Sequence, residues 1–151
     1  MKAPLKIVIT VGLPGSGKST YLQRLGVNAI SSDELRRLII DDPTDQTIHA
    51  RIFAAIRYLI RQRIAVGRPI TYVDATHLMR WERRPYVLLA KQHLCELEAL
   101  FFDVPVEVCI QRNKQRGREV PEEVIRNMAQ CMQPPTEEEG FTRVINVPGT
   151  T

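Results

Sequence analysis

The sequence has few cysteines, and they form no recognisable pattern. Cys95, Cys109 and Cys131 are widely spaced and odd in number, which excludes a simple disulfide framework and a zinc-ligand pattern. His49 and His93 show no metal-ligand spacing either. We therefore expect the cysteines to be small core residues of a protein in a reducing, cytoplasmic compartment.

Long hydrophobic runs are also missing. No apolar stretch is long enough to span a membrane, so we expect no membrane association. The first four residues lead directly into a strand-like run, and we expect no signal peptide. The chain contains no internal repeat and no low-complexity linker. Its 151 residues suit one domain with a substantial core, which we expect to cover residues 1–151.

Acidic residues are slightly outnumbered by basic ones. The net charge is +4, and 16 of the 21 basic residues are arginine. Arginine suits phosphate binding and also suits ordinary surface ion pairs. The charge therefore permits an anionic partner such as nucleic acid without demonstrating one.

One stretch does carry a complete motif. Residues 12–20 have the sequence GLPGSGKST, which fits the phosphate-loop pattern G-x-x-x-x-G-K-[ST]. An apolar, β-branched run precedes it at 5–11, and a helix-like segment follows at 19–25. Strand, glycine loop and helix form an anion site, because glycines let backbone N–H groups curl around a phosphate. The alternative is a glycine turn before an ordinary helix.

The motif predicts a site for ATP and Mg²⁺. Lys18 is expected to reach the β- and γ-phosphates, and the Ser19 hydroxyl is expected to bind Mg²⁺. The residues expected to bind the nucleotide within the loop are Gly12, Gly15, Ser16, Gly17, Lys18, Ser19 and Thr20.

Strand-like and helix-like segments alternate along the chain, which predicts an α/β fold with three layers and a five-stranded parallel sheet. The expected strands are 5–11, 28–31, 69–74, 96–103 and 142–147. The expected helices are 19–25, 32–40, 47–66, 80–93, 105–117 and 121–132.

The helix expected at 47–66 has an arginine-rich side. Its apolar stripe includes Phe53 and Ile60, and the arginines that fall off this stripe are Arg51, Arg57, Arg61 and Arg63. Such a set is usually a solvated face, and it can also be a surface that faces a polyanion. The sequence leaves both interpretations open.

Polar residues follow the expected strands at the edge where ligands bind in such sheets. Asp33 comes after the second strand, and it is either a general base for an attacking hydroxyl or a helix-start residue paired with a nearby arginine. Asp74 ends the third strand, as a metal-side acid or as a turn cap, and Thr76 follows it. His77 is expected to be an ordinary loop residue.

A second arginine group lies near the end of the helix expected at 105–117. Arg112 and Arg116 are four residues apart and share one helix face, and Arg118 follows in a loop with a glycine. They predict a mobile lid around residues 111–121 that neutralises charge on a transferring phosphoryl group. The alternative is an exposed basic helix end.

Several blocks resemble the polynucleotide 5′-hydroxyl kinase domain of bacteriophage and bacterial end-healing enzymes. The matching blocks, besides the phosphate loop, are SDELR at 32–36, DATHL at 74–78, ERR at 82–84, FDVP at 102–105, RNKQRG at 112–117, Val120-Pro121 and Met128. They follow the family's order over most of the chain.

The resemblance implies an ATP-dependent kinase that acts on 5′-hydroxyl ends of DNA or RNA, and a separate phosphatase or ligase is the expected protein partner. It implies that Asp33 is the general base, and that Arg36 binds Asp33 or the phosphate next to the acceptor nucleotide. Lys18, Arg112 and Arg116 would contact the ATP phosphates.

Further substrate contacts are expected from Asp74, Thr76 and Arg80, although the viral enzyme has Asn where this chain has Thr76. The arginines expected along the wall of an acceptor groove are Arg80, Arg83 and Arg84. The rival interpretations are a small-molecule kinase on the same scaffold and a nucleotide-binding regulator.

Overall fold

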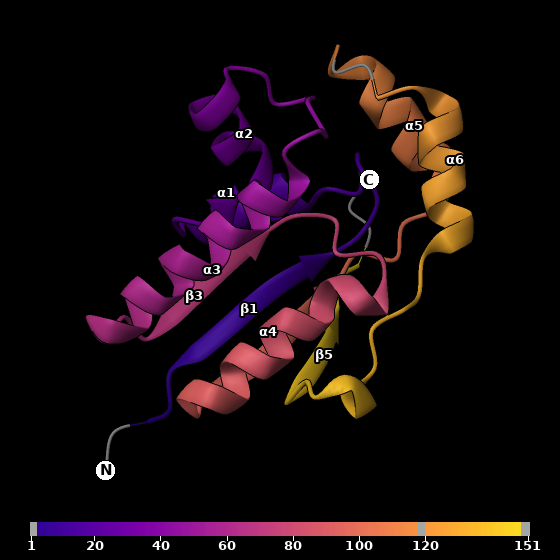
Figure 1. Cartoon of the computed structure of the whole chain (residues 1–151). Coiled ribbons are helices and arrows are strands. Elements are labelled where there is room, and N and C mark those ends of the chain that lie inside the picture. Colours follow the sequence, from indigo (N-terminus) through magenta and orange to yellow (C-terminus); the bar gives the residue numbers. More distant parts are fainter. Residues whose placement is uncertain (1–2, 118–119, 149–151) are drawn as a thin grey trace.

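A parallel sheet of five strands forms the centre of the molecule (Figure 1). The structure is a computed structural model that describes residues 3–117 and 120–148. The strand order is β2-β3-β1-β4-β5, as in a doubly wound sheet. The strands are β1 (Lys6–Val11), β2 (Ile30–Ser31), β3 (Ile70–Asp74), β4 (Glu96–Phe101) and β5 (Arg143–Asn146). Five parallel strands were predicted, and β2 is two residues shorter than expected.

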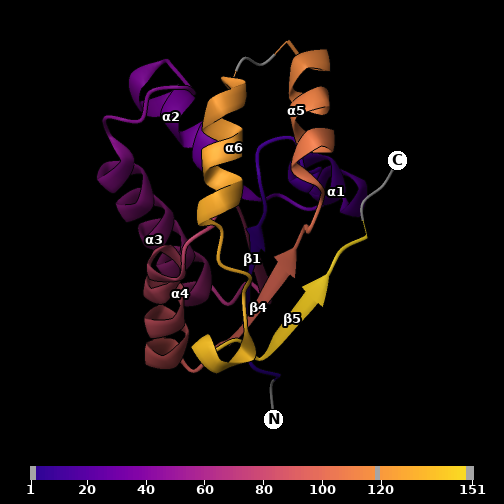
Figure 2. The ribbon, with the colours of Figure 1, turned by 90° about the vertical axis from the view of Figure 1, so that its right-hand side faces the viewer.

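Helices cover both faces of the sheet. They are α1 (Lys18–Leu25), α2 (Ser32–Ile40), α3 (His49–Ala65), α4 (Arg80–His93), α5 (Val106–Gln115) and α6 (Glu122–Cys131), followed by the 3₁₀ helix η1 (Glu137–Glu139). The helices α3 and α4 lie on one face and α1 lies on the other (Figure 2). The pair α5 and α6 stands above the carboxyl ends of the strands, where the lid was predicted.

The central strand β1 is buried because it sends alternate side chains into two cores. Ile7 and Ile9 point into the larger core, where they join Ile56 of α3 and Val87 of α4. Val8 points to the opposite side and packs in the cluster that contains Leu22 of α1. Both layers of helices are therefore fixed to the strand that leads into the phosphate loop.

A third apolar cluster joins the phosphate loop to the lid helices. Leu13 of the loop packs in it with Cys109 and Ile110 of α5 and Ile125 of α6. This packing fixes the base of the lid against the loop that it covers. In the described part of the chain, no helix is both long and apolar enough to cross a membrane.

Candidate active site

A cavity of about 410 Å³ opens at the carboxyl edge of the sheet. Its walls come from the phosphate loop, α2, the end of β3, the start of α3, and the lid helices. Nine of the predicted site residues line it, and eight of these lie outside the lid: Gly15, Gly17, Lys18, Ser19, Asp33, Arg36, Asp74 and Thr76. Arg116 lines it as well, from the lid side.

The backbone of the phosphate loop is suited to an anion. Gly15 and Gly17 have φ angles of 82° and 97°, a region that favours glycine. A Cβ on Gly15 would clash with the carbonyl oxygen of Cys109. The Ser16 Oγ is buried without a hydrogen-bond partner among the described residues. The first-turn amides of α1 have no acceptor within the helix, so the loop offers donors that a phosphate group would satisfy.

Lys18 is buried against the loop that it follows. Its Nζ donates hydrogen bonds to the carbonyl oxygens of Gly12 and Leu13, at 3.0 and 2.8 Å. Burial lowers the pKa of the Lys18 ammonium to about 8, and the neighbouring Asp74 and Asp33 oppose this shift. The negative charge of a phosphate bound at the loop would act in the same direction as Asp74 and Asp33, and would stabilise the charged form of Lys18.

Ser19 and Asp74 meet at the end of β3. The Ser19 Oγ donates a hydrogen bond to Oδ2 of Asp74 at 2.6 Å. No group of three or more histidine, cysteine, aspartate or glutamate side chains is placed to hold a metal within the residues described. Mg²⁺ in phosphoryl-transfer sites needs fewer protein ligands, because substrate phosphates and waters supply the rest. The Ser19–Asp74 pair fits such a site and supports the metal-side interpretation of Asp74.

Asp33 and Arg36 form an ion pair on α2, with Asp33 Oδ1 and Arg36 Nη1 3.6 Å apart. Ser31 caps this helix, since its Oγ accepts the Glu34 N–H at 3.2 Å. The Asp33 carboxylate is 42% exposed, while the Arg36 side chain is only 5% exposed. The Nη2 atom of Arg36 also lies 3.5 Å from Nδ1 of His49. The carboxylate is thus accessible from the cavity, and the guanidinium is held behind it.

The Arg36 guanidinium retains unused hydrogen-bonding capacity. Its Nε is buried and has no partner among the described residues. Its Nη2 donates to Oε1 of Gln46 at a long distance of 3.4 Å. Burial lowers the pKa of Arg36, and the charge of Asp33 opposes this effect. A phosphate at this wall would provide the acceptor that the buried N–H lacks.

The predicted lid arginines lie over the phosphate loop. Arg116 Nη2 donates to Oγ1 of Thr20 at 3.0 Å. A Cβ on Gly17 would lie 3.7 Å from Nη1 of Arg112, so the Arg112 guanidinium is above this glycine. Asn113 Nδ2 donates to the Val120 carbonyl oxygen at 2.8 Å and ties the two ends of the lid together. Arg118 lies outside the described residues.

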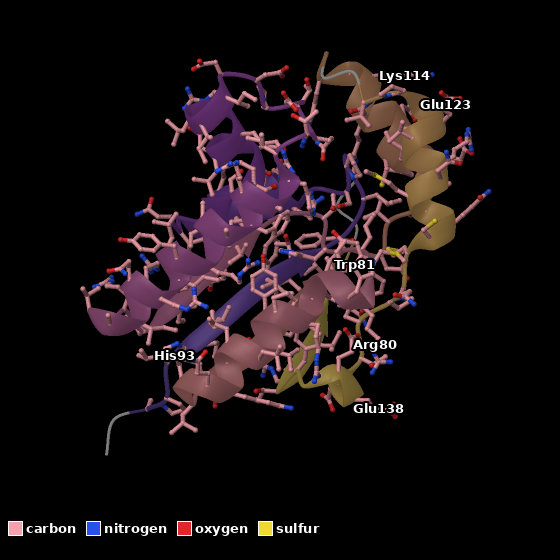
Figure 3. The ribbon with its side chains drawn as sticks, viewed as in Figure 1. Arg80, Trp81, His93, Lys114, Glu123 and Glu138 are labelled. Atoms are coloured by element: carbon pink, nitrogen blue, oxygen red, sulfur yellow. The ribbon has the colours of Figure 1, made fainter. Side chains whose placement is uncertain are left out.

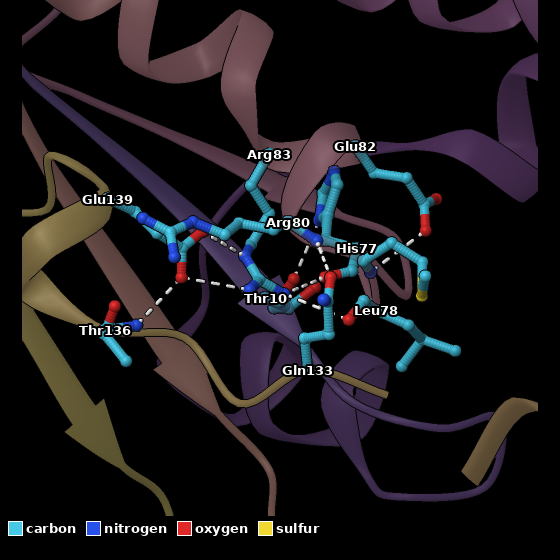
Figure 4. Close-up of polar contacts among 10 residues, drawn as sticks. Thr10, His77, Leu78, Arg80, Glu82, Arg83, Gln133, Thr136 and Glu139 are labelled. Carbon is cyan, nitrogen blue, oxygen red and sulfur yellow. Dashed lines mark hydrogen bonds and ion pairs between the residues drawn. The ribbon is translucent and has the colours of Figure 1, made fainter. Parts of the chain in front are cut away.

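Two expectations from the sequence are corrected by burial. Arg83 was expected on a groove wall, but its side chain is fully buried and donates to both carboxylate oxygens of Glu139 at 2.8 and 3.0 Å (Figure 4). His77 was expected to be an ordinary loop residue, but it is fully buried between Thr10 and Tyr86. Arg80 is exposed at the start of α4 (Figure 3) and is not among the described residues that line the cavity.

Residues of α3 and α6 also line the cavity, and the sequence did not predict them as part of the site. His49 and Phe53 are one helical turn apart, and their rings are in contact with centroids 4.5 Å apart. Val124 and Met128 line the lid side with the same spacing on α6. Their i, i+4 spacing marks a shared helix face, but it does not reveal that the face borders a cavity.

Comparison with known proteins assigns the family. The family described as "AAA domain" matches residues 7–135, which include the phosphate loop and the lid. The chain belongs to this AAA-domain family. Within it, the chain has the α/β fold and the phosphate loop of P-loop kinases.

A curated relative is the L-seryl-tRNA(Sec) kinase of Methanococcus maripaludis, which is 25% identical over 132 residues. The match covers 81% of this chain and 50% of that protein. The chain spans half or less of the length of three curated relatives to which it is similar.

Two solved structures show the same fold. One is the Pnkp1/Rnl/Hen1 RNA repair complex, with a TM-score of 0.72 and 22% identity, covering 86% of this chain and 44% of that one. The other is a gluconokinase from Sinorhizobium meliloti 1021, with a TM-score of 0.64 and 22% identity, covering 100% of this chain and 86% of that one. The predicted fold class is confirmed.

Proposed function

We propose that this chain is an ATP-dependent kinase that transfers the γ-phosphoryl group of ATP to the 5′-hydroxyl end of DNA or RNA. The observation that carries the proposal is the Asp33–Arg36 pair, which borders the same cavity as the phosphate loop. A nucleotide-binding regulator needs no carboxylate at an acceptor position. An accessible carboxylate suits an acceptor hydroxyl, and the buried Arg36 Nε beside it, which has no partner among the described residues, suits a phosphate near that hydroxyl.

In the proposed reaction, Asp33 takes the proton of the acceptor hydroxyl as the hydroxyl oxygen bonds to the γ-phosphorus. The bond between that phosphorus and the β,γ-bridging oxygen breaks, and ADP leaves. Lys18 and Arg116 offset the charge that develops during transfer, and Arg112 acts with them from the lid. Mg²⁺, held by Ser19 with Asp74 beside it, would neutralise phosphate charge.

Similar proteins support a nucleic-acid acceptor. One solved structure of the same fold is named as a component of an RNA repair complex, and a curated relative is named as a kinase of seryl-tRNA. On the same grounds, we propose that a separate ligase or phosphatase works with this chain.

A small-molecule kinase is the second candidate. It is favoured by the gluconokinase structure, of which this fold covers 86%. The cavity of about 410 Å³ is also large enough for a small acceptor beside the phosphates.

The decisive experiment is transfer of label from ATP to a panel of acceptors. The panel contains a 5′-hydroxyl oligonucleotide, a nucleoside 3′-phosphate, a nucleoside, gluconate and a seryl-tRNA. We expect the oligonucleotide and the nucleoside 3′-phosphate to be labelled best, because each supplies a phosphate for Arg36. Much better labelling of gluconate would replace the proposal with the small-molecule kinase.

Two substitutions test the residues in this experiment. Asp33→Asn should lower the transfer rate roughly a hundredfold or more, because it keeps the size of the side chain but cannot accept the proton. Asp41→Asn, at the exposed end of the same helix, is the matched control and should keep the wild-type rate. Arg36→Ala should raise the KM for the acceptor and leave the KM for ATP nearly unchanged. A wild-type rate in Asp33→Asn would exclude Asp33 as the base.

A further inference from the structure

A second pocket lies on the outer surface of the helix layer. It has a volume of about 330 Å³ and lies between α3 and α4. We name it the α3–α4 pocket; it is lined by Arg57, Arg61, Trp81, Arg84, Pro85, Leu88, Leu89 and Gln92. Trp81 is 65% exposed and Leu88 is 51% exposed. An aromatic side chain and an apolar side chain are therefore open to solvent beside three arginines.

The charge of the α3–α4 pocket has one sign. Of the described residues that line it, three are arginines and none is acidic. Within the part of the chain that the structure describes, no hydrogen bond or ion pair links Arg57, Arg61 or Arg84 to another side chain. Arg63 of the same helix differs, because it donates to the Thr71 hydroxyl at 2.9 Å and to the Ile70 carbonyl oxygen at 2.8 Å. The pocket arginines are thus available to an anionic partner.

The α3–α4 pocket begins where the active-site cavity ends. On α3, Phe53 lines the cavity, and Arg57 and Arg61 follow it at successive helical turns. On α4, Glu82 lines the cavity and its neighbour Trp81 lines the pocket, at the first turn of the helix (Figure 3). Eight residues separate His49 in the cavity from Arg57, which is about 12 Å along a helix. A few nucleotides of extended strand would span this distance.

We propose that the α3–α4 pocket binds the single-stranded stretch of the acceptor that lies 3′ of its reacting end. A base stacks on Trp81, and phosphates contact Arg57, Arg61 and Arg84. Aromatic stacking together with arginine–phosphate contacts is how proteins hold single strands without reading their sequence. This inference rests on the proposed function, because it requires that the acceptor is a nucleic acid.

Trp81 is the single tryptophan of the chain, so its fluorescence reports directly on the pocket. We expect a 5′-hydroxyl oligothymidylate to quench this fluorescence as it binds. A nucleoside 3′-phosphate and a blunt duplex should quench little, because the first does not reach the pocket and the second has no unpaired base.

Arg57→Ala and Arg84→Ala should each weaken binding and lower the slope of log K against log salt by about 0.7. Arg24→Ala, on the opposite face of the molecule, is the matched control.

Kinetics provide the second readout. Trp81→Ala should raise the KM for the oligothymidylate about tenfold, the scale of one lost stacking contact. Its KM for a nucleoside 3′-phosphate should stay at the wild-type value. Tyr58→Ala removes an exposed aromatic side chain of α3 that does not line the pocket, and it should change neither value.

The outcomes separate this inference from the proposed function. Transfer to oligothymidylate with no quenching, and with an unchanged KM in Trp81→Ala, would overturn the pocket assignment and leave the kinase proposal intact. Quenching without any transfer would overturn the kinase proposal, and with it the assignment of the bound strand as the acceptor. Equal quenching by polyglutamate would show a general polyanion patch and overturn the assignment to nucleic acid.

Discussion

At the scale of single residues, the hydrogen bonds of His77 define its protonation. Its Nδ1 lies 2.7 Å from the carbonyl oxygen of Thr10, which can only accept, so Nδ1 carries the proton. Its Nε2 then accepts the hydroxyl proton of Tyr86 at 2.8 Å. Burial lowers the pKa of His77 to about 4 and raises the pKa of Tyr86. The neutral ring therefore connects Thr10, near the end of the buried strand β1, to Tyr86 of α4.

This pKa shift predicts a dependence of stability on pH. The folded pKa of about 4 lies below the ordinary value of 6.5, so the unfolded chain binds more protons between these two values. The free energy of unfolding should therefore fall as the pH falls from about 6.5 to about 4, by on the order of 3 kcal/mol. Urea denaturation of the wild type and of His77→Gln would measure this difference. Parallel pH curves for the two proteins would contradict the assignment of a neutral, buried His77.

Local patterns predicted single residues well where the reason was local. Gly15 and Gly17 of the phosphate loop adopt positive φ, as expected for a loop that curls around a phosphate, because the local motif sets this requirement. Arg83 could not be assigned in this way. Its partner Glu139 lies 56 residues away, and nothing near Arg83 distinguishes it from the exposed Arg84.

At the scale of elements, the ion pair of Arg83 and Glu139 holds α4 against η1. Arg83 also donates to the carbonyl oxygens of His77 and Leu78, so one guanidinium joins a helix, a loop and the chain before β5. Arg83→Met would leave the Glu139 carboxylate buried without its cation and should cost about 3–5 kcal/mol of stability. Chemical denaturation would measure this loss, with exposed Arg84→Ala as the neighbouring control. Full stability with lost acceptor binding would instead support Arg83 as a groove residue.

Arg116 links the lid helices to the phosphate loop. Arg116 projects from the end of α5 to Thr20, so its guanidinium is already beside the phosphate loop. Arg116→Ala should slow phosphoryl transfer on the order of 10³-fold if the residue acts like an arginine finger. Lys114→Ala is the control, because Lys114 is exposed and its ammonium pairs with Glu122 within the lid. Single-turnover rates would distinguish the two variants, and equal rates would remove Arg116 from the reaction.

The order and type of the elements followed from periodicity, whereas their ends did not. β4 ends at Phe101, two residues before its predicted end at Asp103. The segment that follows leads through Pro105 into α5 and is not part of the sheet. α3 begins at His49, two residues after the expected start, because the Asp45 carboxylate accepts the Thr47 N–H in a local turn. Such turns compete with the first turn of a helix and shift its start.

At the scale of the whole molecule, the cavity is assembled from segments that are distant in sequence. Lys18, Asp74 and Met128 come from the first strand–helix unit, the third strand and the last helix, yet all three line one space. The sequence predicted that strand ends converge, because parallel strands share an edge. It could not predict the lining from α3 and α6, since that depends on how two helices pack.

This arrangement predicts that a nucleotide stabilises the folded chain only, because the unfolded chain has no cavity. At a nucleotide concentration one hundred times the Kd, the gain should be about 2.7 kcal/mol. For a chain of this size, that corresponds to a rise in Tm of roughly 5–10 °C. Thermal unfolding with ATP and Mg²⁺ would measure it, and Arg24→Ala should show the same rise as the wild type.

Lys18→Met separates stability from binding in the same measurement. The Lys18 ammonium is buried, and burial disfavours its charge. In a variant with methionine, the relief of this buried charge should offset the two lost hydrogen bonds to Gly12 and Leu13, so the Tm without nucleotide should be nearly unchanged. The rise with ATP should be largely lost, because the loop then lacks its cation for the phosphates. A full rise in Lys18→Met would show that the nucleotide does not depend on the phosphate loop. A large loss of stability without nucleotide, together with a full rise on adding ATP, would show that Lys18 serves the fold and not the phosphates.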